Sequence, residues 1–568
     1  MNQLYYGDNL DVLRRHIADE SVDLVYLDPP FNSNASYNVL FAERDGAQAA
    51  SQIKAFEDTW RWDESAARAF EEVVETGGKV SQVMQAFRTF LGESDMLAYL
   101  AMMAPRLVEL RRVLKPTGSL YLHCDPTASH YLKMLLDAVF GPGHFRNELV
   151  WKRTSARSDS HRWNQIHDTI LFYSKSDEYV WNPQYTPYSA EYQADFYGGA
   201  DNRGDAFMSD NLTAAGVRHG ESGKPWRDVD PTKRGRHWAL PVRVVEQLGL
   251  TGTVQERLDG LDNAGYIIWP KKQSGMPRYK RLLKDMPGLA IQSIISDIPP
   301  LSAKSAERLG YPTQKPESLL ERIVAASSNE GDVVLDPFCG CGTTIAAATK
   351  LNRRWIGIDV TALAISLIRS RLTDTFGANN AQYEVIGEPV SLPDAVKLAK
   401  DDPYQFQWWA LGLVHARPVE QKKGADQGID GRIYFHEGES RKTQQIIFSV
   451  KAGKLHAPYV RDLRGVVERE KAAIGVLLCL DEPTRAMKTE AASAGFYASP
   501  WGKHPRLQIL TIEELLTGTL LDRPPAQASV TFKRAPKAAG PVMKGRSLDF
   551  GAATEDMGDD EPTDEDPD

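Results

Sequence analysis

Residues 332–359 read DVVLDPFCGCGTTIAAATKLNRRWIGID, and this stretch decides the fold of the chain. The apolar run 332–335 predicts a short buried strand. The turn over 336–342 is rich in glycine, which suits a backbone that bends tightly and lies close to a ligand. A helix is expected over 343–350 and a second strand over 355–358. The stretch therefore predicts one βαβ unit of an α/β sheet.

Segments on either side of this unit continue the alternation of strands and helices. Residues 22–27 (VDLVYL) and 119–123 (SLYLH) are short apolar runs that predict buried strands. Amphipathic or buried helices are expected over 94–114, 128–140, 317–327 and 363–372. Strands that alternate with helices predict a doubly wound α/β sheet.

A chain of 568 residues is too long for one ordinary core, so more than one domain is expected. We predict that residues 1–150 and 301–375 together form the sheet domain. Residues 151–300 lack its regularity and are rich in Trp, Tyr, Gly, Arg and Lys. A second, smaller α/β domain is expected over 400–518, and a linker with a disordered acidic tail over 522–568.

The formal net charge is −9, and the last fourteen residues alone contain nine acids and no Lys or Arg. The rest of the chain is therefore neutral by count and leaves room for local basic clusters. The four cysteines form neither a disulfide framework nor a zinc pattern. With no apolar run long enough for a bilayer and no signal peptide, a cytoplasmic protein without a membrane partner is expected.

A second motif, Asp28-Pro29-Pro30-Phe31, follows the predicted strand 22–27. The exocyclic amine of adenine or cytosine is a poor nucleophile, because its lone pair is delocalised into the ring. The Asp28 carboxylate can accept one amine hydrogen and the Pro29 carbonyl the other, so that the lone pair is oriented for attack. Pro30 stiffens the turn, and Phe31 can stack on a flipped-out base for about 1–3 kcal/mol. Taken alone, the motif could also be an ordinary strand-end turn.

The order of these two motifs resembles that of the amino-directed DNA methyltransferases of the permuted (beta) group, which include type III modification subunits. The resemblance covers roughly residues 1–375. It implies a Rossmann-like domain that uses S-adenosyl-L-methionine to methylate N6 of adenine in double-stranded DNA, within a restriction–modification or related system. Cytosine-N4 enzymes of the group more often carry Ser in place of Asp28, so Asp28 favours adenine and leaves N4-cytosine as the alternative.

The resemblance also assigns cofactor contacts to three segments. Segment 311–316 (YPTQKP) is implied to hold the methionine end of the cofactor, and Gly7-Asp8-Asn9 to approach its adenine ring. Asp359 ends a strand, where a carboxylate can bind the two ribose hydroxyls. No metal ion is expected in this domain. The implied cofactor contacts are Asp8, Thr313, Gln314, Lys315, Asp336, Phe338, Gly340, Gly342, Thr343 and Asp359.

The irregular region 151–300 is the candidate for reading the DNA sequence. A first basic cluster surrounds Trp238, and a second cluster, within residues 271–284, contains six Lys or Arg and no acids. Such residues suit phosphate contacts, and Tyr279 and Trp238 suit base stacking. The candidate DNA contacts are Lys233, Arg234, Arg236, Lys271, Lys272, Lys280 and Arg281.

In the C-terminal domain, Gly428-Ile429-Asp430-Gly431 and Phe448-Ser449-Val450-Lys451 resemble the core of PD-(D/E)xK nucleases, especially Mrr-type restriction domains. Asp430 and Lys451 fit that pattern, whereas Ser449 stands where an acid or Gln is usual and is a weak Mg²⁺ ligand. Mg²⁺ is therefore expected at Asp430 only if the domain is an active nuclease.

Three functions stay open for the C-terminal domain. It could be a working nuclease, which would make the chain a fused restriction–modification enzyme. It could instead be an inactive relative that binds DNA, or a module for packing or dimerisation. A separate restriction subunit and a homodimer are the further partners that the resemblance leaves open.

Overall fold

The structure is a computed structural model that describes most of the chain. The described residues are 1–30, 62–154, 163–201, 203–271, 275–302, 305–309, 311, 313–377, 382–419, 428–437, 442–525, 531 and 535–537. Phe31, Lys272 and the predicted acidic tail lie outside them. The contacts divide the chain into two compact units, one formed by Met1–Val180 with Ile295–Asp568, and the other by Trp181–Ile294.

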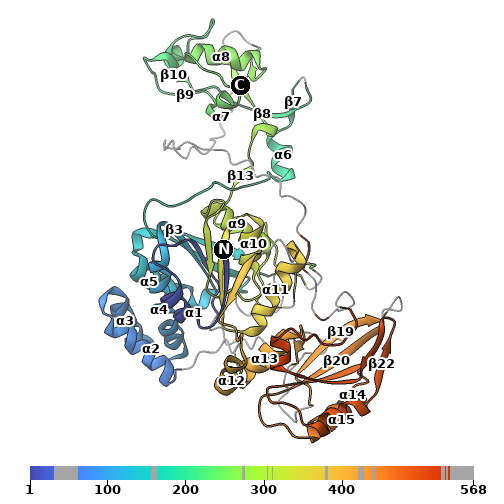
Figure 1. Ribbon diagram of the computed structural model, residues 1–568. Coiled ribbons are helices and arrows are strands. Elements are labelled where there is room, and N and C mark those ends of the chain that lie inside the picture. Colours follow the sequence, from blue (N-terminus) through green and yellow to red (C-terminus); the bar gives the residue numbers. More distant parts are fainter. Residues whose placement is uncertain are drawn as a thin grey trace. The chain divides into compact units, whose positions relative to one another are not determined.

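Nine strands of the first unit form one sheet in the order β14-β4-β5-β3-β2-β15-β16-β1-β17 (Figure 1). The six neighbours from β3 to β17 run parallel, and β5 is antiparallel to both β3 and β4. The strands are β1 (Asn2–Tyr6), β2 (Val22–Leu27), β3 (Leu114–Cys124), β4 (Phe145–Lys152), β5 (His167–Ser174), β14 (Ile294–Ile295), β15 (Val333–Asp336), β16 (Arg354–Asp359) and β17 (Tyr383–Ile386). This arrangement confirms the predicted α/β sheet.

Helices cover both faces of this sheet (Figure 1). One face packs on α1 (Asn9–His16), α4 (Asp95–Val113) and α5 (Pro126–Phe140), and the other on α9 (Glu317–Ser327), α10 (Thr343–Lys350) and α11 (Ala362–Phe376). Strand β2 serves both cores, because Val25 and Leu27 face the first group of helices while Leu24 and Tyr26 face the second. The four predicted helices are thus confirmed within a few residues at their ends.

Two further helices, α2 (Glu64–Glu75) and α3 (Gly78–Leu91), were not predicted. Their buried residues Phe70, Met84 and Phe87 join the core on the α4 and α5 side of the sheet.

Four parallel strands bring the sequence motifs to one edge of the sheet. Along β2 and β15, Val25 pairs with Leu335, so Asp28 and Asp336 both lie at the carboxyl ends. Asp359 ends β16 opposite Tyr6 of β1. The carboxyl edge of open parallel sheets is where such folds bind ligands.

The second unit, Trp181–Ile294, is built from short elements around a small core. Its sheets have the orders β11-β12-β8-β7, β10-β9 and β13-β6. The elements are β6 (Tyr185–Thr186), α6 (Ala190–Phe196), β7 (Gly199–Ala200), β8 (Ala206–Asn211), β9 (Thr213–Ala215), β10 (Arg236–Trp238), α7 (Val242–Gln247), α8 (Val254–Asn263), β11 (Ile267–Ile268), β12 (Arg278–Leu282) and β13 (Leu289–Ala290). The predicted recognition region 151–300 is longer than this unit, because the apolar run of β5 joins the main sheet.

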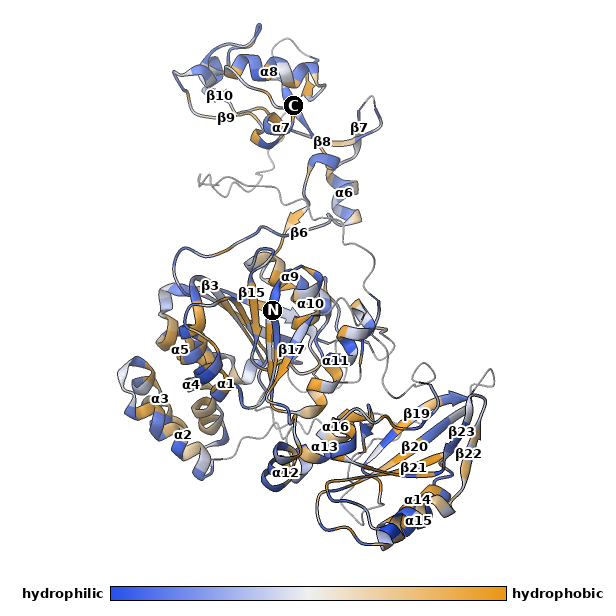
Figure 2. Ribbon diagram, viewed as in Figure 1, coloured by the Kyte–Doolittle hydropathy of each residue, from blue (hydrophilic) through white to orange (hydrophobic). Residues whose placement is uncertain are grey.

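The C-terminal part of the first unit contains a five-stranded sheet in the order β18-β19-β20-β21-β24. Figure 2 shows β21, like β15 of the main sheet, coloured largely as hydrophobic. One face packs on α13 and the other on α14 and α15. The elements are α12 (Leu392–Asp401), α13 (Pro403–Leu413), β18 (Arg417–Pro418), β19 (Gly431–Glu437), β20 (Lys442–Lys451), α14 (Pro458–Arg469), β21 (Ile474–Cys479), α15 (Arg485–Ser493), β22 (Phe496–Ser499), β23 (Gly502–Pro505), β24 (Leu507–Thr511) and α16 (Ile512–Leu516). Among the described residues, no helix combines the length and apolar character that crossing a bilayer requires.

Candidate active site

The turn between β15 and α10 depends on two glycines with left-handed backbones. Gly340 has a φ of 48° and Gly342 a φ of 75°. A Cβ atom on Gly342 would lie 2.8 Å from Cγ1 of Ile368, so a side chain there would require α11 to shift. The Gly340 backbone N–H donates to Oδ2 of Asp359 at 2.9 Å. The carboxylate at the end of β16 therefore helps to fix the shape of the turn.

Two carboxyl groups lie beside this turn, Asp336 buried and Asp359 half-buried. Oδ1 of Asp336 accepts a hydrogen bond from the Phe338 backbone N–H at 3.0 Å, and burial raises the pKa of Asp336 to about 7. Oδ1 of Asp359 accepts from the backbone and hydroxyl of Thr361 at 2.9 and 2.8 Å, and burial raises the pKa of Asp359 to about 6. Negative charge is thus costly at both positions, which suits a ligand that brings positive charge or hydroxyl donors.

The N-terminal segment 7–9 lies against the same turn. The Gly7 backbone N–H donates to the Asp359 carbonyl at 3.0 Å. Asn9 donates through Nδ2 to the Pro337 carbonyl at 2.8 Å. The structure thus brings together the two segments, about 330 residues apart, that were predicted to hold one cofactor.

The Asp8 carboxylate already binds other groups of the protein. It caps α1 by accepting from the Leu10 backbone N–H at 2.9 Å, and it forms an ion pair with Arg106 at 2.7 Å. Arg106 also donates to Oδ1 of Asn9 at 2.5 Å. These contacts orient the segment, and they favour a structural contribution by the Asp8 side chain. Arg106 was missed by the sequence reasoning, because no motif surrounds it within α4.

The three predicted cofactor residues of segment 311–316 lie in different environments. Thr313 is exposed. Gln314 braces the preceding loop, since its side chain donates to the Glu307 carbonyl and accepts from the Leu309 backbone N–H, both at 2.8 Å. Lys315 is buried and faces the motif that follows β2. The segment therefore reaches the cofactor motif and the base motif at the same time.

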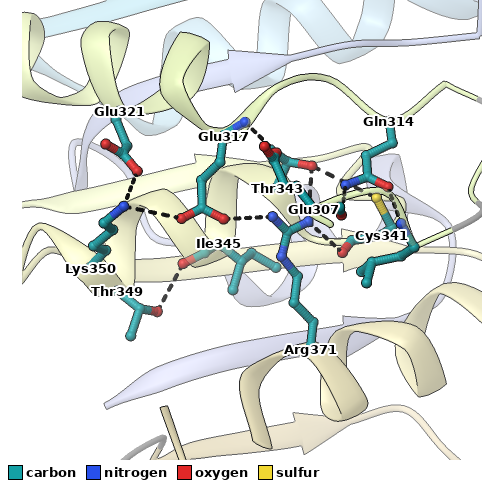
Figure 3. A network of polar contacts seen from close by, with 11 residues as sticks. Glu307, Gln314, Glu317, Glu321, Cys341, Thr343, Ile345, Thr349, Lys350 and Arg371 are labelled. Atoms are coloured by element: carbon teal, nitrogen blue, oxygen red, sulfur yellow. Dashed lines mark hydrogen bonds and ion pairs between the residues drawn. The ribbon is translucent and has the colours of Figure 1, made fainter. Parts of the chain in front are cut away.

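Arg371 connects the start of α9, which directly follows this segment, to the glycine turn (Figure 3). Its guanidinium donates to the Thr343 hydroxyl at 3.1 Å and the Cys341 carbonyl at 3.4 Å, and it forms an ion pair with Glu317 at 2.8 Å. The Glu317 backbone N–H donates in turn to the Glu307 carboxylate at 2.6 Å. The Thr343 hydroxyl is therefore held by the protein. Arg371 was not identified from the sequence, because one cation on an apolar helix gives no sign of its partners.

Asp28 lies directly after β2, and its side chain is only 15% exposed. Its Oδ2 atom is 2.5 Å from Nζ of Lys315, whose side chain is 9% exposed. Pro29 is buried and Pro30 is exposed. The negative charge of Asp28 contributes to the raised pKa of Asp336, which shows that the two motifs are close in space.

A buried polar row lies behind Asp28. The Tyr26 hydroxyl is 2.8 Å from Nδ1 of His123, and Nε2 of His123 is 3.1 Å from Oδ2 of Asp168. Arg153 lies 3.2 Å from the other oxygen of Asp168. Burial opposes the charge on Asp168, but the hydrogen bond and charge of His123, with Lys315 and Arg153, lower its pKa overall. The row crosses three neighbouring strands and rigidifies the sheet beneath the base motif.

Only part of the first predicted DNA-contact cluster is available at the surface of the second unit. Lys233 and Arg234 are exposed at the end of a short 3₁₀ turn, Pro231–Arg234. Arg236 donates to the Thr213 hydroxyl and carbonyl, both at 2.8 Å. Trp238 is 2% exposed, so its predicted role in base stacking was wrong. An aromatic ring beside cations can belong to the core as readily as to the surface.

The second cluster shows the same division. Lys271 is exposed, whereas Lys280 and Arg281 are half-buried. Arg281 forms an ion pair with Asp210 at 3.6 Å. Tyr279 is buried, so its predicted surface role was also wrong.

The nuclease-like motif of the C-terminal domain is engaged in hydrogen bonds. Asp430 accepts from the Gln407 side chain at 2.9 Å through Oδ1, and from the Val450 backbone N–H at 2.6 Å through Oδ2. Ser449 is buried, and the Lys451 ammonium lies 5.4 Å from the ring centroid of Tyr459. In the part of the chain that the structure describes, no three His, Cys, Asp or Glu side chains are grouped to hold a metal ion.

Two parts of the chain match known protein families. A family model described as DNA methylase matches residues 22–369, and one described as NACHT-associated inactive restriction endonuclease 1 matches residues 405–517. The type II methyltransferase M.EcaI of Enterobacter cloacae is 36% identical over 275 residues, which are 48% of this chain and 57% of that protein. The type III restriction-modification enzyme StyLTI Mod subunit of Salmonella typhimurium is 26% identical over 418 residues, covering 68% and 55%. The chain thus spans just over half the length of these relatives.

Two solved structures have low overall similarity. The M1.HpyAVI–SAM complex is 15% identical with a TM-score of 0.29, and the match covers 66% of this chain and 99% of that chain. The cytosine-N4-specific PvuII DNA methyltransferase is 13% identical with a TM-score of 0.30, covering 65% and 85%. The fold assignment therefore rests on the strand order of the sheet itself. Because the DNA methylase model matches more than half of the 568 residues, the chain belongs to the N6/N4 DNA methylase family.

Proposed function

We propose that the protein transfers a methyl group from S-adenosyl-L-methionine to the exocyclic N6 of adenine in double-stranded DNA. One observation carries the proposal: the adjacent carboxyl ends of β2 and β15 place Asp28 beside Asp336. An amine held at Asp28 and a cofactor held at the glycine turn would then meet at one edge of the sheet. Membership of the DNA methylase family supports the same assignment.

The donor set at this edge fits the cofactor. The buried Asp336 and the half-buried Asp359 have raised pKa values, and an ammonium group or ribose hydroxyls would satisfy them. Gly340 and Gly342 let the backbone lie close to a ligand. S-adenosylmethionine, when bound, supplies a methyl group on a positively charged sulfur. Asp336, Phe338 and Asp359 are the residues that we assign to holding it.

Asp28 and Pro29 would prepare the nucleophile. The Asp28 carboxylate accepts one amine hydrogen and the Pro29 carbonyl the other, which turns the nitrogen lone pair out of conjugation with the ring. As the N–C bond formed and the methyl–sulfur bond broke, the nitrogen would become positive, and the Asp28 carboxylate would stabilise that charge more than it stabilises the neutral amine. Loss of one proton from the nitrogen to solvent would then restore a neutral methylamino group.

Nucleoside analysis of DNA from cells that express the chain, beside cells with the empty vector, tests this function. N6-methyladenine only in the expressing cells is the expected result. N4-methylcytosine would keep the mechanism but overturn the assignment of adenine as the target base, which rests on Asp28. Absence of both products in cells with verified, folded protein would contradict the proposal.

We propose that the second unit binds the DNA backbone through Lys233, Arg234 and Lys271, which are the exposed residues among the described candidate DNA contacts. Changing all three to Gln is expected to weaken DNA binding and to reduce the slope of log K against log salt by about 0.9 for each phosphate that the protein no longer neutralises. The measurement is fluorescence anisotropy over a range of salt concentrations. Lys397, Lys400 and Lys488, which are exposed elsewhere, form the matched triple control. Equal slopes for both triple variants and the unaltered protein would move the DNA path to other residues.

We propose that the C-terminal domain does not cleave DNA, because both Asp430 oxygens are hydrogen-bonded to the protein and Ser449 replaces a carboxylate. Purified protein with Mg²⁺ is expected to leave unmethylated DNA intact. Asp430→Ala is expected to reduce the free energy of unfolding by about 1–3 kcal/mol, because Val450 and Gln407 lose a buried acceptor. If the unaltered protein instead cleaves DNA, and Asp430→Ala or Lys451→Ala abolishes this cleavage while methylation stays intact, the chain is a fused restriction–modification enzyme. Without such cleavage, restriction would require a separate subunit.

A further inference from the structure

The contact between Lys315 and Asp28 is not explained by a role of Lys315 at the methionine end of the cofactor. Lysine is rarely buried unless its charge is paired. Here the Lys315 side chain is 9% exposed, and its Nζ lies 2.5 Å from Oδ2 of Asp28. The two residues come from segments 287 positions apart. The contact therefore belongs to the base motif as much as to the cofactor motif.

Asp28 lies in a region with several other acids. Burial is the main reason why the pKa of Tyr26 lies well above its usual value, and the negative charges of Asp28, Asp336 and Asp168 raise it further. Asp168 has His123 and Arg153 as its own partners, and the charge of Lys315 also lowers the pKa of Asp168. Among the described residues, the titratable and charged groups around Asp28 are Tyr26 on β2, Cys124 on β3, Asp168 on β5, Asp336 at the end of β15, and Tyr311 and Lys315 before α9.

The two oxygens of Asp28 differ in their surroundings. Lys315 donates to Oδ2, and within the described part of the chain Oδ1 makes no hydrogen bond. A carboxylate that is fixed through one oxygen presents the other in a defined direction. An ammonium group can donate but cannot accept, so it does not compete for the amine hydrogen that the base must donate.

We propose that Lys315 is a positioning residue of the base site, whose ammonium group holds Oδ2 of Asp28 and directs Oδ1 toward the amine of the target base. This inference rests on the proposed methyltransferase function. It separates Lys315 from the cofactor contacts and assigns it to the nucleophile side of the reaction. The distinction is measurable, since the two roles predict losses in different kinetic constants.

Lys315→Met is expected to lower kcat by about 10- to 100-fold, because the Asp28 carboxylate loses its orientation. The acid limb of the pH profile of kcat/KM for DNA is expected to move upward by about 1–3 pH units, because the charge that favours ionised Asp28 is gone. The Kd for S-adenosylmethionine, measured by calorimetry, is expected to stay nearly unchanged. Lys315→Arg keeps the charge and should restore the position of the acid limb.

Lys115→Met is the matched control. Lys115 pairs with Asp23 at 2.8 Å on the same strand β2, but toward its amino end. Its loss removes a comparable ion pair and should leave the pH profile in place. A large rise in the cofactor Kd of Lys315→Met, with the acid limb unmoved, would overturn the proposal and return Lys315 to the cofactor site.

A double-mutant cycle of Asp28→Asn and Lys315→Met in thermal unfolding separates this inference from the proposed function. A clear coupling between the two substitutions supports the ion pair whether or not the protein methylates DNA. Additive effects would overturn the positioning role even in an active enzyme. An inactive unaltered protein with coupled residues would contradict the proposed function alone.

Discussion

Asp28→Asn is expected to reduce kcat for methyl transfer by about 10²–10³-fold or more, while the Kd for S-adenosylmethionine stays nearly unchanged. Asn has the size of Asp but lacks its negative charge, so it stabilises the developing positive charge on the amine nitrogen less well. Its amide nitrogen can also present a donor where the amine requires an acceptor. Asp28 follows β2 and is not itself part of the glycine turn after β15, which predicts that cofactor binding survives its substitution.

Single-turnover methyl transfer and calorimetric titration of the cofactor provide the two readouts for Asp28→Asn. Asp11→Asn is a suitable control, because the Asp11 side chain on α1 is 62% exposed and forms only a surface ion pair with Arg15. A large loss of cofactor affinity in Asp28→Asn would show that the base and cofactor sites have been exchanged in our assignment. An unaltered kcat would remove Asp28 from the reaction.

Arg371→Met is expected to lower the free energy of unfolding by about 1–3 kcal/mol, because the largely buried Glu317 loses a charged hydrogen-bond partner and keeps Lys350, at 3.6 Å, as its other cation. Cofactor affinity should fall as well, since Arg371 joins the Cys341 carbonyl and the Thr343 hydroxyl to α9 (Figure 3). Urea denaturation and calorimetric titration measure the two effects.

Arg68→Met, on α2, is the control for Arg371→Met. Arg68 forms an ion pair with Glu64 at 3.8 Å, and the two side chains are 71% and 87% exposed, so its loss should cost no more than about 1 kcal/mol. Similar destabilisation by both substitutions would show that the buried network contributes no more than an ordinary surface ion pair. Loss of stability without loss of cofactor affinity would separate the network from the glycine turn.

Local sequence patterns predicted four strands of the main sheet, β2, β3, β15 and β16. The runs VDLVYL and DVVLD are apolar over one strand length, and Asp28 and Asp336 follow them in turns rich in Pro or Gly. Such patterns depend on neighbours in the chain, so they predicted both the strands and the residues at their ends. Ser94 likewise marked the start of α4, where its side chain accepts from the Leu97 backbone N–H.

The partners of individual charged side chains could not be predicted in the same way. Arg106, Arg371 and Lys315 each contact a residue from a distant segment, and no periodicity reports such a contact. Trp238 and Tyr279 show the opposite problem. Their basic neighbours in the sequence suggested a surface for DNA, whereas both rings pack in the core of the second unit.

The position of β1 has a consequence for how the chain folds during its synthesis. This first strand, Asn2–Tyr6, has β16 and β17 as its two neighbours in the sheet, and they lie at Arg354–Asp359 and Tyr383–Ile386. At about 5–20 residues per second, the ribosome needs roughly 20 to 70 s to produce them after β1. Strand β1 is therefore made long before the two strands that pair with it, and chaperones have that interval in which to shield its unpaired edges.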